Sequence, residues 1–145
     1  MTTVSTAGRQ LTAEQQAALA GDAGSISLSA GAGCGKTTVL TERFLAYVDP
    51  TVGRATQDLS SLVAITFTDA AAREMRARVR RRCWERFRDA AESDEAMAWQ
   101  KLLRALDSAQ ISTIHAFCSQ LLRQHAIPLV IDPQFEMLEE AAADL

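Results

Sequence analysis

A glycine-rich loop followed by a lysine and two threonines is the part of this chain best suited to chemistry. Residues 25–38 read Ser-Ile-Ser-Leu-Ser-Ala-Gly-Ala-Gly-Cys-Gly-Lys-Thr-Thr. A short apolar run, Ile26 to Leu28, precedes the loop and predicts a β-strand, while a helix-compatible stretch over 39–48 follows it. Strand, glycine loop and helix, in that order, are the context in which a phosphate-binding P-loop works.

The residue types of this loop suit the phosphates of a nucleoside triphosphate. Glycines let backbone N–H groups approach phosphate oxygens, and the start of the following helix adds a positive dipole end. Lys36 would supply a cation to the β- and γ-phosphates, and the Thr37 hydroxyl would ligate Mg²⁺. One departure is Ala30, which stands where the general pattern has glycine. The residues expected to hold the nucleotide are Ala30, Gly31, Ala32, Gly33, Cys34, Gly35, Lys36, Thr37 and Thr38. The alternative is a glycine-rich turn before a helix with a solvated lysine, which the flanking strand and helix disfavour.

Composition points to a globular domain that does not enter a membrane. The chain has 145 residues, 48% of them hydrophobic and 23% charged, and a chain of this size buries about 68–70% of its unfolded surface. No apolar run approaches the roughly 18 residues of a membrane span. Residues 1–10 are polar and lack the apolar core of a secretion signal, so we expect a flexible N-terminus and a cytoplasmic location. The three cysteines form no CxxC pair, which favours reduced thiols over a metal site.

Arginines are concentrated between residues 73 and 88, although the net charge of the chain is −3. The negative total argues weakly against a dedicated nucleic-acid-binding domain of the basic type. Two interpretations of the cluster stay open. The arginines could track a phosphate backbone, or they could form an ordinary solvated helix face, which composition alone favours.

The pattern along the chain alternates strands with helices of ten or more residues. A helix is expected over 12–19, where Thr12 and Gln15 have the spacing of a capping box, and the loop helix should end near Asp49 and Pro50. Strands are expected over 26–28, 62–67, 110–114 and 135–138. Further helices are expected from 68 or 69 onward, over 96–106 and 116–125, and from 139, with loops near 90–95 and around the prolines at 128 and 133. This alternation predicts βαβ units and a mostly parallel sheet.

The long helix that follows the second apolar run carries its own packing signal. Apolar residues recur every four positions along it and form one stripe, with the arginines largely outside that stripe. The residues of the stripe are Ala71, Met75, Val79, Cys83 and Phe87.

Four segments, taken together, resemble one known family. They are Leu11-Thr-Ala-Glu-Gln15, the loop at 30–37, the segment Ile65-Thr-Phe-Thr-Asp-Ala-Ala-Ala-Arg-Glu-Met-Arg-Ala-Arg78, and Ser112-Thr-Ile-His-Ala-Phe-Cys118. In this order and spacing the set resembles the N-terminal motor domain of UvrD/Rep-type superfamily 1 DNA helicases. The sequence of residues 113–118, with Asp132-Pro133-Gln134-Phe135 after it, is most similar to the AddA/RecB-like branch.

The resemblance implies a fold and an activity. It implies that residues 11–145 form the N-terminal part of a UvrD-like ATP-binding domain: a P-loop NTPase with a RecA-like, mostly parallel sheet flanked by helices. The activity implied is that of a bacterial ATP-dependent DNA helicase, moving 3′ to 5′ on single-stranded DNA in repair or recombination. The implied ligands and partners are ATP, Mg²⁺, single-stranded DNA and a helicase-nuclease partner subunit.

The chain also lacks parts that such a motor needs. No apolar strand ending in an Asp-Glu pair follows the loop, and no second motor domain is present to donate arginines. The sequence stops within a predicted helix, so we expect a piece of a longer protein that hydrolyses ATP negligibly by itself.

The resemblance also assigns roles to individual residues, each beside a structural alternative. Gln15 matches a glutamine that reads adenine, whereas the residues alone favour the capping box equally. Thr66, Phe67 and Thr68 match a segment that touches single-stranded DNA, where an aromatic stacks on a base and hydroxyls bind phosphate. The alternative for them is a buried strand end, and for Phe67 the two interpretations can both hold in part.

A second DNA segment is implied further along the chain. Thr113 and His115 match a stretch close to the DNA path, although a lone histidine is more often structural. At 69 this chain has aspartate where the family usually has asparagine. An acid beside DNA would repel phosphate unless it were turned away as a helix cap.

Asp69 leaves two rival functions open. An apolar strand followed by an acid could be a Walker B strand, which would make this a compact P-loop kinase-like enzyme. Two observations count against a kinase: alanine rather than glutamate follows Asp69, and paired lid arginines are absent near the end of the sequence. The other rival is a nucleotide-dependent regulatory module without motor function, and DNA-stimulated ATP turnover would exclude it.

Overall fold

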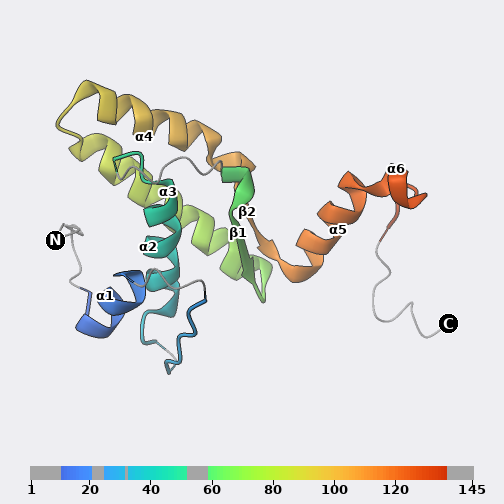
Figure 1. The fold of residues 1–145 in the computed structure, drawn as a ribbon, viewed down its shortest axis with the longest axis horizontal. Helices are drawn as coiled ribbons and strands as arrows, with labels where there is room; N and C mark the ends of the chain where they lie inside the picture. The colour runs from blue at the N-terminus through green and yellow to red at the C-terminus, as the bar shows by residue number, and fades with distance from the viewer. Residues whose placement is uncertain (1–10, 21–24, 32, 52–58, 137–145) are drawn as a thin grey trace.

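The computed structural model describes residues 11–20, 25–31, 33–51 and 59–136, which form an α/β arrangement. The helices are α1 (Ala13–Ala20), α2 (Lys36–Val48), α3 (Asp69–Asp89), α4 (Ser93–Ala105), α5 (Ile114–Gln124) and α6 (Ala126–Leu129). Two strands, β1 (Val63–Thr66) and β2 (Gln110–Thr113), lie between them, with short 3₁₀ turns η1 (Leu59–Ser61) and η2 (Leu106–Ser108) ahead of each. The parallel sheet that the alternation predicted is therefore present (Figure 1).

β1 and β2 pair in parallel, and the connection between them consists of α3 and α4. Val63 lies opposite Gln110 and Thr66 lies opposite Thr113, so the strands start and finish level with one another. Parallel neighbours need a long crossover, and the two antiparallel helices supply it. Because the register is level, the segments that follow β1 and β2 leave the sheet at the same end.

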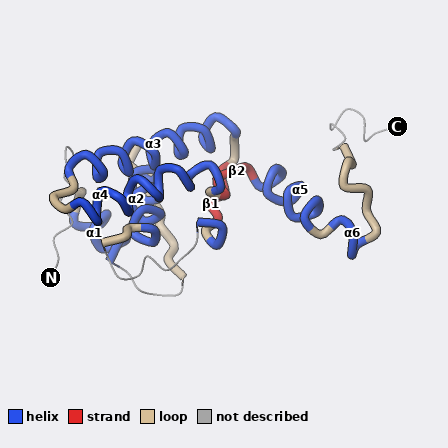
Figure 2. Tube along the Cα trace, turned by 90° about the horizontal axis from the view of Figure 1, so that it is seen from above, coloured by secondary structure: helices blue, strands red, loops and turns tan. Residues whose placement is uncertain are grey.

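α3 follows its sequence signals closely. The Thr68 hydroxyl accepts a hydrogen bond from the Ala71 N–H at 3.1 Å, which caps the helix as expected. The middle of the predicted apolar stripe is fully buried, with Met75, Val79 and Cys83 at most 1% exposed, whereas Ala71 and Phe87 at its ends are partly exposed. α3 consequently contacts α2, α4 and both strands. Figure 2 shows these helices grouped on one side of the strands, with α5 and α6 on the other.

The core joins residues from every element except α1, α5 and α6. Its largest fully buried side chain is Trp99 of α4, which is 1% exposed. The buried residues of this cluster are Phe44, Leu45, Val48, Leu59, Ala64, Met75, Val79, Cys83, Trp99, Leu106, Ala109 and Ile111.

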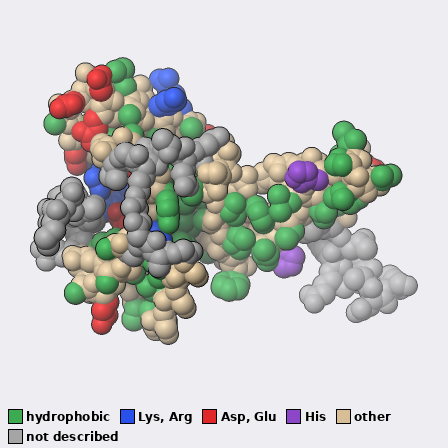
Figure 3. All heavy atoms as spheres, in the orientation of Figure 1, with side chains coloured by type: hydrophobic (Ala, Val, Ile, Leu, Met, Phe, Trp, Pro, Cys, Tyr) green, Lys and Arg blue, Asp and Glu red, His purple; other side chains and the backbone are tan. Residues whose placement is uncertain are grey.

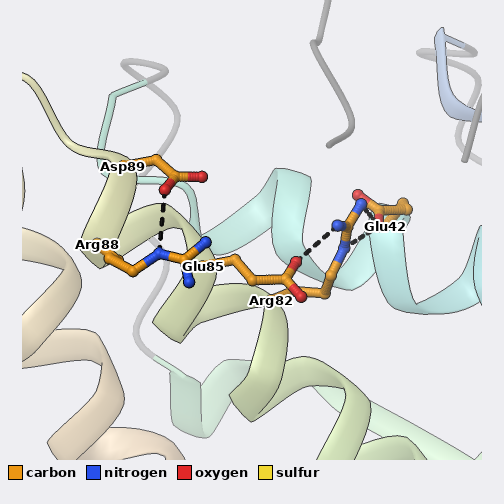
Figure 4. A network of polar contacts seen from close by, with 5 residues as sticks. All are labelled: Glu42, Arg82, Glu85, Arg88 and Asp89. Atoms are coloured by element: carbon orange, nitrogen blue, oxygen red, sulfur yellow. Dashed lines mark hydrogen bonds and ion pairs between the residues drawn. The ribbon is translucent and has the colours of Figure 1, made fainter. Parts of the chain in front are cut away.

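A buried ion pair fixes α2 against α3. Arg82 of α3 donates through Nε to the Glu42 carboxylate of α2 at 2.7 Å and through a terminal nitrogen to Glu85 at 2.8 Å (Figure 4). Glu42 is only 7% exposed and Arg82 19%. Burial by itself would lower the pKa of Arg82, but the hydrogen bonds and charges of Glu85 and Glu42 outweigh it and raise that pKa. This ion pair therefore joins α2, the helix that follows the glycine loop, to α3, the helix that Thr68 caps.

The expected first strand does not form. Residues 25–31 have no regular secondary structure, and the Ile26 and Leu28 side chains are 38% and 42% exposed. A strand exists only where a neighbour completes its hydrogen-bond ladder, and the sheet seen among the described residues contains β1 and β2 alone. The apolar run is therefore present without the pairing that would make it a strand.

Other element boundaries also differ from expectation. Residues 135 and 136 are not in a strand, and the remainder of the predicted fourth strand lies outside the described residues, as does the helix expected from 139. α4 starts at Ser93 rather than 96, since Asp94 and Glu95 in its first turn complement the helix dipole. Pro128 lies inside the short helix α6, in its first turn, where its missing N–H is tolerated.

α5 and α6 extend away from the rest of the molecule as an arm (Figure 1). Apolar side chains cover much of this arm in the view of Figure 3. The exposed large apolar residues of the arm, together with the two residues that follow α6, are Ile114, Leu121, Leu122, Ile127, Leu129, Val130 and Ile131. Among the described residues, no helix combines the length and the apolar character that crossing a membrane would require.

Candidate nucleotide and nucleic-acid site

The glycine loop adopts a backbone that only glycine takes readily. Gly33 and Gly35 have φ angles of 78° and 82°, in the left-handed region. Gly35 is the N-cap of α2, and no side chain caps that helix. Ala32 lies outside the described residues. The two glycines thus turn the chain so that the first N–H groups of α2 are free to meet an anion.

Lys36 folds back over the loop. Its Nζ donates to the backbone carbonyls of Ala30 and Gly31, both at 2.7 Å. Lys36 and Thr37 remain exposed in the first turn of α2. An ammonium, a helix start and a threonine hydroxyl are therefore gathered at one end of α2, a set of donors that suits phosphate.

Gln15 makes both contacts of a capping box. Its Oε1 accepts from the Thr12 N–H at 3.0 Å, and its own N–H donates to the Thr12 hydroxyl at 3.3 Å. The capping box is therefore confirmed. A third contact was not anticipated: Gln15 Nε2 donates to the carbonyl of Cys34 at 3.1 Å and so joins α1 to the loop.

The five residues expected to touch DNA lie at one end of the sheet. We call Thr66, Phe67, Thr68, Thr113 and His115 the strand-edge cluster. Thr66 is paired with Thr113 in the last rung of the ladder, so the segments after β1 and β2 begin side by side. Phe67 is 103% exposed, and His115 is exposed in the first turn of α5. For Phe67 the alternative of a buried strand end is therefore wrong.

The threonine hydroxyls of this cluster differ in whether their protons are available to donate a hydrogen bond. Thr68 and Thr113 each accept a backbone N–H, from Ala71 at 3.1 Å and Ala116 at 3.4 Å, and keep their hydroxyl protons available. The Thr66 hydroxyl donates its proton to the Thr68 carbonyl at 3.0 Å. Thr68 and Thr113 can therefore donate to a phosphate, whereas Thr66 cannot do so without losing its present contact.

Most arginines of the 73–88 run are engaged within the molecule. Arg78 pairs with Glu74 at 2.5 Å, Arg80 with Asp107 at 2.5 Å, and Arg88 with Asp89 at 3.3 Å. Arg76 donates to the Ile111 carbonyl at 2.6 Å and so ties α3 to β2 across 35 residues. These contacts favour the solvated and structural interpretation of the run over a continuous phosphate track. Nothing in the sequence marks Arg76 apart from its neighbours.

The acids and thiols in the described part of the chain show no metal-binding arrangement. Asp69 is the first residue of α3 and is exposed, while Thr68 rather than Asp69 is the cap. Among the described residues, no three His, Cys, Asp or Glu side chains gather closely enough to hold a metal ion. Burial raises the pKa of the Cys83 thiol to about 12, with Asp49 adding to the effect, so Cys83 is an inert core residue.

Comparison with known proteins finds relatives over a stretch that contains all four sequence segments, at 11–15, 30–37, 65–78 and 112–118. Residues 11–144 match the family model described as the UvrD/REP helicase N-terminal domain. A protein of Pelotomaculum thermopropionicum, named as one subunit of an ATP-dependent helicase/nuclease, is 38% identical over 134 residues, 92% of this chain. A protein with the same name from Geobacillus thermodenitrificans is 36% identical over 139 residues, 96% of this chain. The protein of that name from Latilactobacillus sakei is 38% identical over 94% of this chain.

The match covers this chain almost completely but only a small part of those relatives. It spans 10%, 11% and 15% of the three proteins, in the same order. The shared family disfavours a compact kinase-like enzyme, since the likeness extends over all four segments and not over the glycine loop alone. This chain belongs to the UvrD/REP helicase N-terminal domain family.

Proposed function

We propose that this chain is the ATP-binding portion of a DNA helicase that moves along single-stranded DNA in repair or recombination. ATP and Mg²⁺ would bind at the glycine loop, and the strand-edge cluster would contact the DNA. The same proposal includes the RecA-like fold, the 3′-to-5′ direction, a partner subunit, and a cytoplasmic location. These parts rest on the family and on the names of the relatives.

The level register of β1 and β2 is the observation that carries this proposal. It brings two segments 47 residues apart, which begin at Thr66 and Thr113, to one end of a parallel sheet. Ligands of α/β proteins bind outside the carboxyl ends of parallel strands. An exposed phenylalanine with two threonines able to donate is a suitable surface for a strand of bases and phosphates.

The residues of the glycine loop suit ATP and Mg²⁺. The positive φ angles of Gly33 and Gly35 turn the chain directly ahead of the start of α2. Lys36 can exchange its two carbonyl contacts for phosphate oxygens, and the Thr37 oxygen is the hard ligand that Mg²⁺ prefers. When bound, the metal would neutralise charge on the phosphates, and these residues would hold and orient the phosphate chain.

Replacing Lys36 tests the nucleotide half of the proposal. Hydrogen bonds to charged groups contribute about 1.5–3 kcal/mol, so Lys36→Ala should weaken Mg-ATP binding about 10- to 150-fold in calorimetry. Lys101→Ala is a matched control, because Lys101 is the other lysine of the chain and is exposed on α4. Unchanged ATP affinity in a folded Lys36→Ala variant would refute the P-loop assignment.

ATP turnover separates the remaining alternatives. The isolated chain should hydrolyse ATP negligibly, with or without DNA, because arginine fingers alone contribute roughly 10³–10⁵ in rate to related reactions. The complete protein should hydrolyse ATP faster when single-stranded DNA is added. Turnover that DNA leaves unchanged in the complete protein would favour the regulatory module. Full activity of the isolated chain would favour a compact enzyme.

A further inference from the structure

We propose that Arg43 is a positioning residue for base recognition, and that it acts by holding α1, the helix that carries Gln15. Its contribution would appear in the affinity for ATP and not in the affinity for the phosphates alone. The inference rests on the proposed ATP site at the glycine loop and on the reading of adenine by Gln15 that the family resemblance implies. It gives a role to a residue outside both the glycine loop and the strand-edge cluster.

Arg43 of α2 bonds the carboxyl end of α1. Its Nη1 donates to the Ala18 carbonyl at 2.9 Å, across 25 residues of sequence. The last four carbonyls of a helix have no partner within it, and the Ala18 carbonyl is one of these because α1 ends at Ala20. A cationic guanidinium also suits the negative end of the helix dipole. The contact therefore caps α1 and joins it to α2.

The bonded carbonyl belongs to a residue on the same face of α1 as Gln15. Residues three and four apart share a helix face, and Gln15, Ala18 and Leu19 have this spacing. Ala18 is buried, Gln15 and Leu19 are partly buried, and the other residues of α1 are exposed. The core cluster contains no residue of α1, and a helix of 8 residues is marginal without tertiary contacts. Polar contacts on this face therefore contribute to where α1 lies.

α2 carries Arg43 and the phosphate-facing lysine on one helix. Arg43 follows Lys36 by seven residues, which is about two helical turns and 10 Å, so the two lie on the same face. Tyr47, one turn further, orients the guanidinium. Its hydroxyl accepts from Arg43 Nη2 at 3.2 Å, and its ring centroid lies 5.6 Å from the Arg43 Cζ. Arg43 therefore ties the helix of Gln15 to the helix that carries Lys36.

The position of α1 matters most for contacts that Gln15 makes. Gln15 Nε2 donates to the Cys34 carbonyl at 3.1 Å, so the amide lies beside the glycine loop. A hydrogen bond to a base requires a donor–acceptor distance of about 2.7–3.2 Å. A small displacement of α1 would break such a bond. The start of α2 and Lys36 would still meet the phosphates, because they belong to α2 itself.

The test compares ATP with inorganic tripolyphosphate, which has the phosphates but no base. Both are titrated with Mg²⁺ into the wild-type chain and into Arg43→Met, which removes the guanidinium and keeps a long side chain. Loss of one neutral hydrogen bond to the base should weaken ATP about two- to tenfold, and tripolyphosphate should change less than twofold. Arg73→Met is the matched control, because Arg73 is exposed on α3 and its loss removes the same charge. It should change either affinity less than twofold.

A double variant tests whether Arg43 acts through Gln15. Gln15→Met should by itself weaken ATP by a similar factor and leave tripolyphosphate nearly unchanged. Adding Arg43→Met should then cause no further loss, because two residues that serve one contact are not additive. Losses that multiply in the double variant would show two independent contributions and overturn the inference.

Three other results would overturn it. Unchanged ATP affinity in folded Arg43→Met would leave Arg43 no role in binding. Equal losses for ATP and tripolyphosphate would make it a support of the fold or of the phosphate loop. Unchanged ATP affinity in Gln15→Met would remove the residue through which it acts. If Arg43→Met does not fold, Arg43→Gln, which is shorter and neutral, is measured instead by the same criteria. If the wild-type chain binds neither ligand, or Lys36→Ala binds both unchanged, it is the proposed nucleotide site that fails.

Discussion

Phe67 gives the sharpest test of the strand-edge cluster, because its exposure separates binding from stability. Its side chain is 103% exposed, so Phe67→Ala removes no buried surface. The free energy of unfolding should change by no more than about 0.5 kcal/mol, as for other surface substitutions. A buried phenylalanine would instead cost about 3–5 kcal/mol on truncation. Stacking on one base contributes about 1–3 kcal/mol, so DNA affinity should fall about 5- to 150-fold.

The assay measures affinity and thermal unfolding on the same preparation. Fluorescence anisotropy of a labelled oligothymidine reports single-strand affinity, and calorimetry of Mg-ATP checks that the glycine loop is unaffected. Trp84→Ala is the matched control, because Trp84 is 54% exposed on α3 and contacts Phe87 rather than the strand-edge cluster. It should leave DNA affinity unchanged.

Two results would refute the assignment of Phe67. Unchanged DNA affinity with normal folding would remove it from the DNA surface. A fall in melting temperature of more than about 4 °C would show that Phe67 supports the fold in the protein as it exists in solution. A loss of affinity in Trp84→Ala equal to that in Phe67→Ala would mean that exposed aromatic residues of this chain bind the oligonucleotide non-specifically.

Three further predictions follow from the ion pair of Arg82 with Glu42 and from the cysteines. Arg82→Leu should lower the free energy of unfolding in urea by about 3–5 kcal/mol, because it leaves Glu42 buried without its partner. Adding Glu42→Leu should recover most of that loss. Additive losses in the double variant would contradict a paired role. Cys34 and Cys118 are exposed and should react with Ellman's reagent in the folded chain, whereas Cys83 should react only after unfolding. Since the folded Cys83 pKa is raised from 9.0 to about 12, the unfolded chain loses that proton first, so stability should fall as pH rises through this window, and less steeply in Cys83→Ala.

Local signals in the sequence predicted the elements that depend on local chemistry. Thr68 as a helix cap, the Thr12–Gln15 capping box and the buried middle of the α3 stripe were all predictable from residue type and spacing. The helix end at Asp49 was predictable as well, because the residue before Pro50 avoids helical angles and is extended here. Each of these features is determined within about one or two helical turns.

Features that depend on distant partners could not be predicted. The pairing of Arg82 with Glu42 spans 40 residues, and the sequence offers seven other arginines within 73–88 for the same role. The run at 26–28 has the composition of a strand, but pairing depends on neighbours that composition does not specify. The link from Gln15 to Cys34 likewise depends on how α1 meets the loop, which no periodicity encodes.

The α5–α6 arm has a consequence for how this chain would behave in solution. Its principal contacts with the rest of the molecule are those of α5 with β1 and β2. A helix of 11 residues is marginal in water without tertiary packing, so the arm should open as a cooperative unit separate from the α2–α3–α4 body. Amide hydrogens of α5 would then exchange with deuterium far sooner than those of α3. A chain that exposes this much aliphatic surface at one end is also expected to self-associate at high concentration, first through that arm.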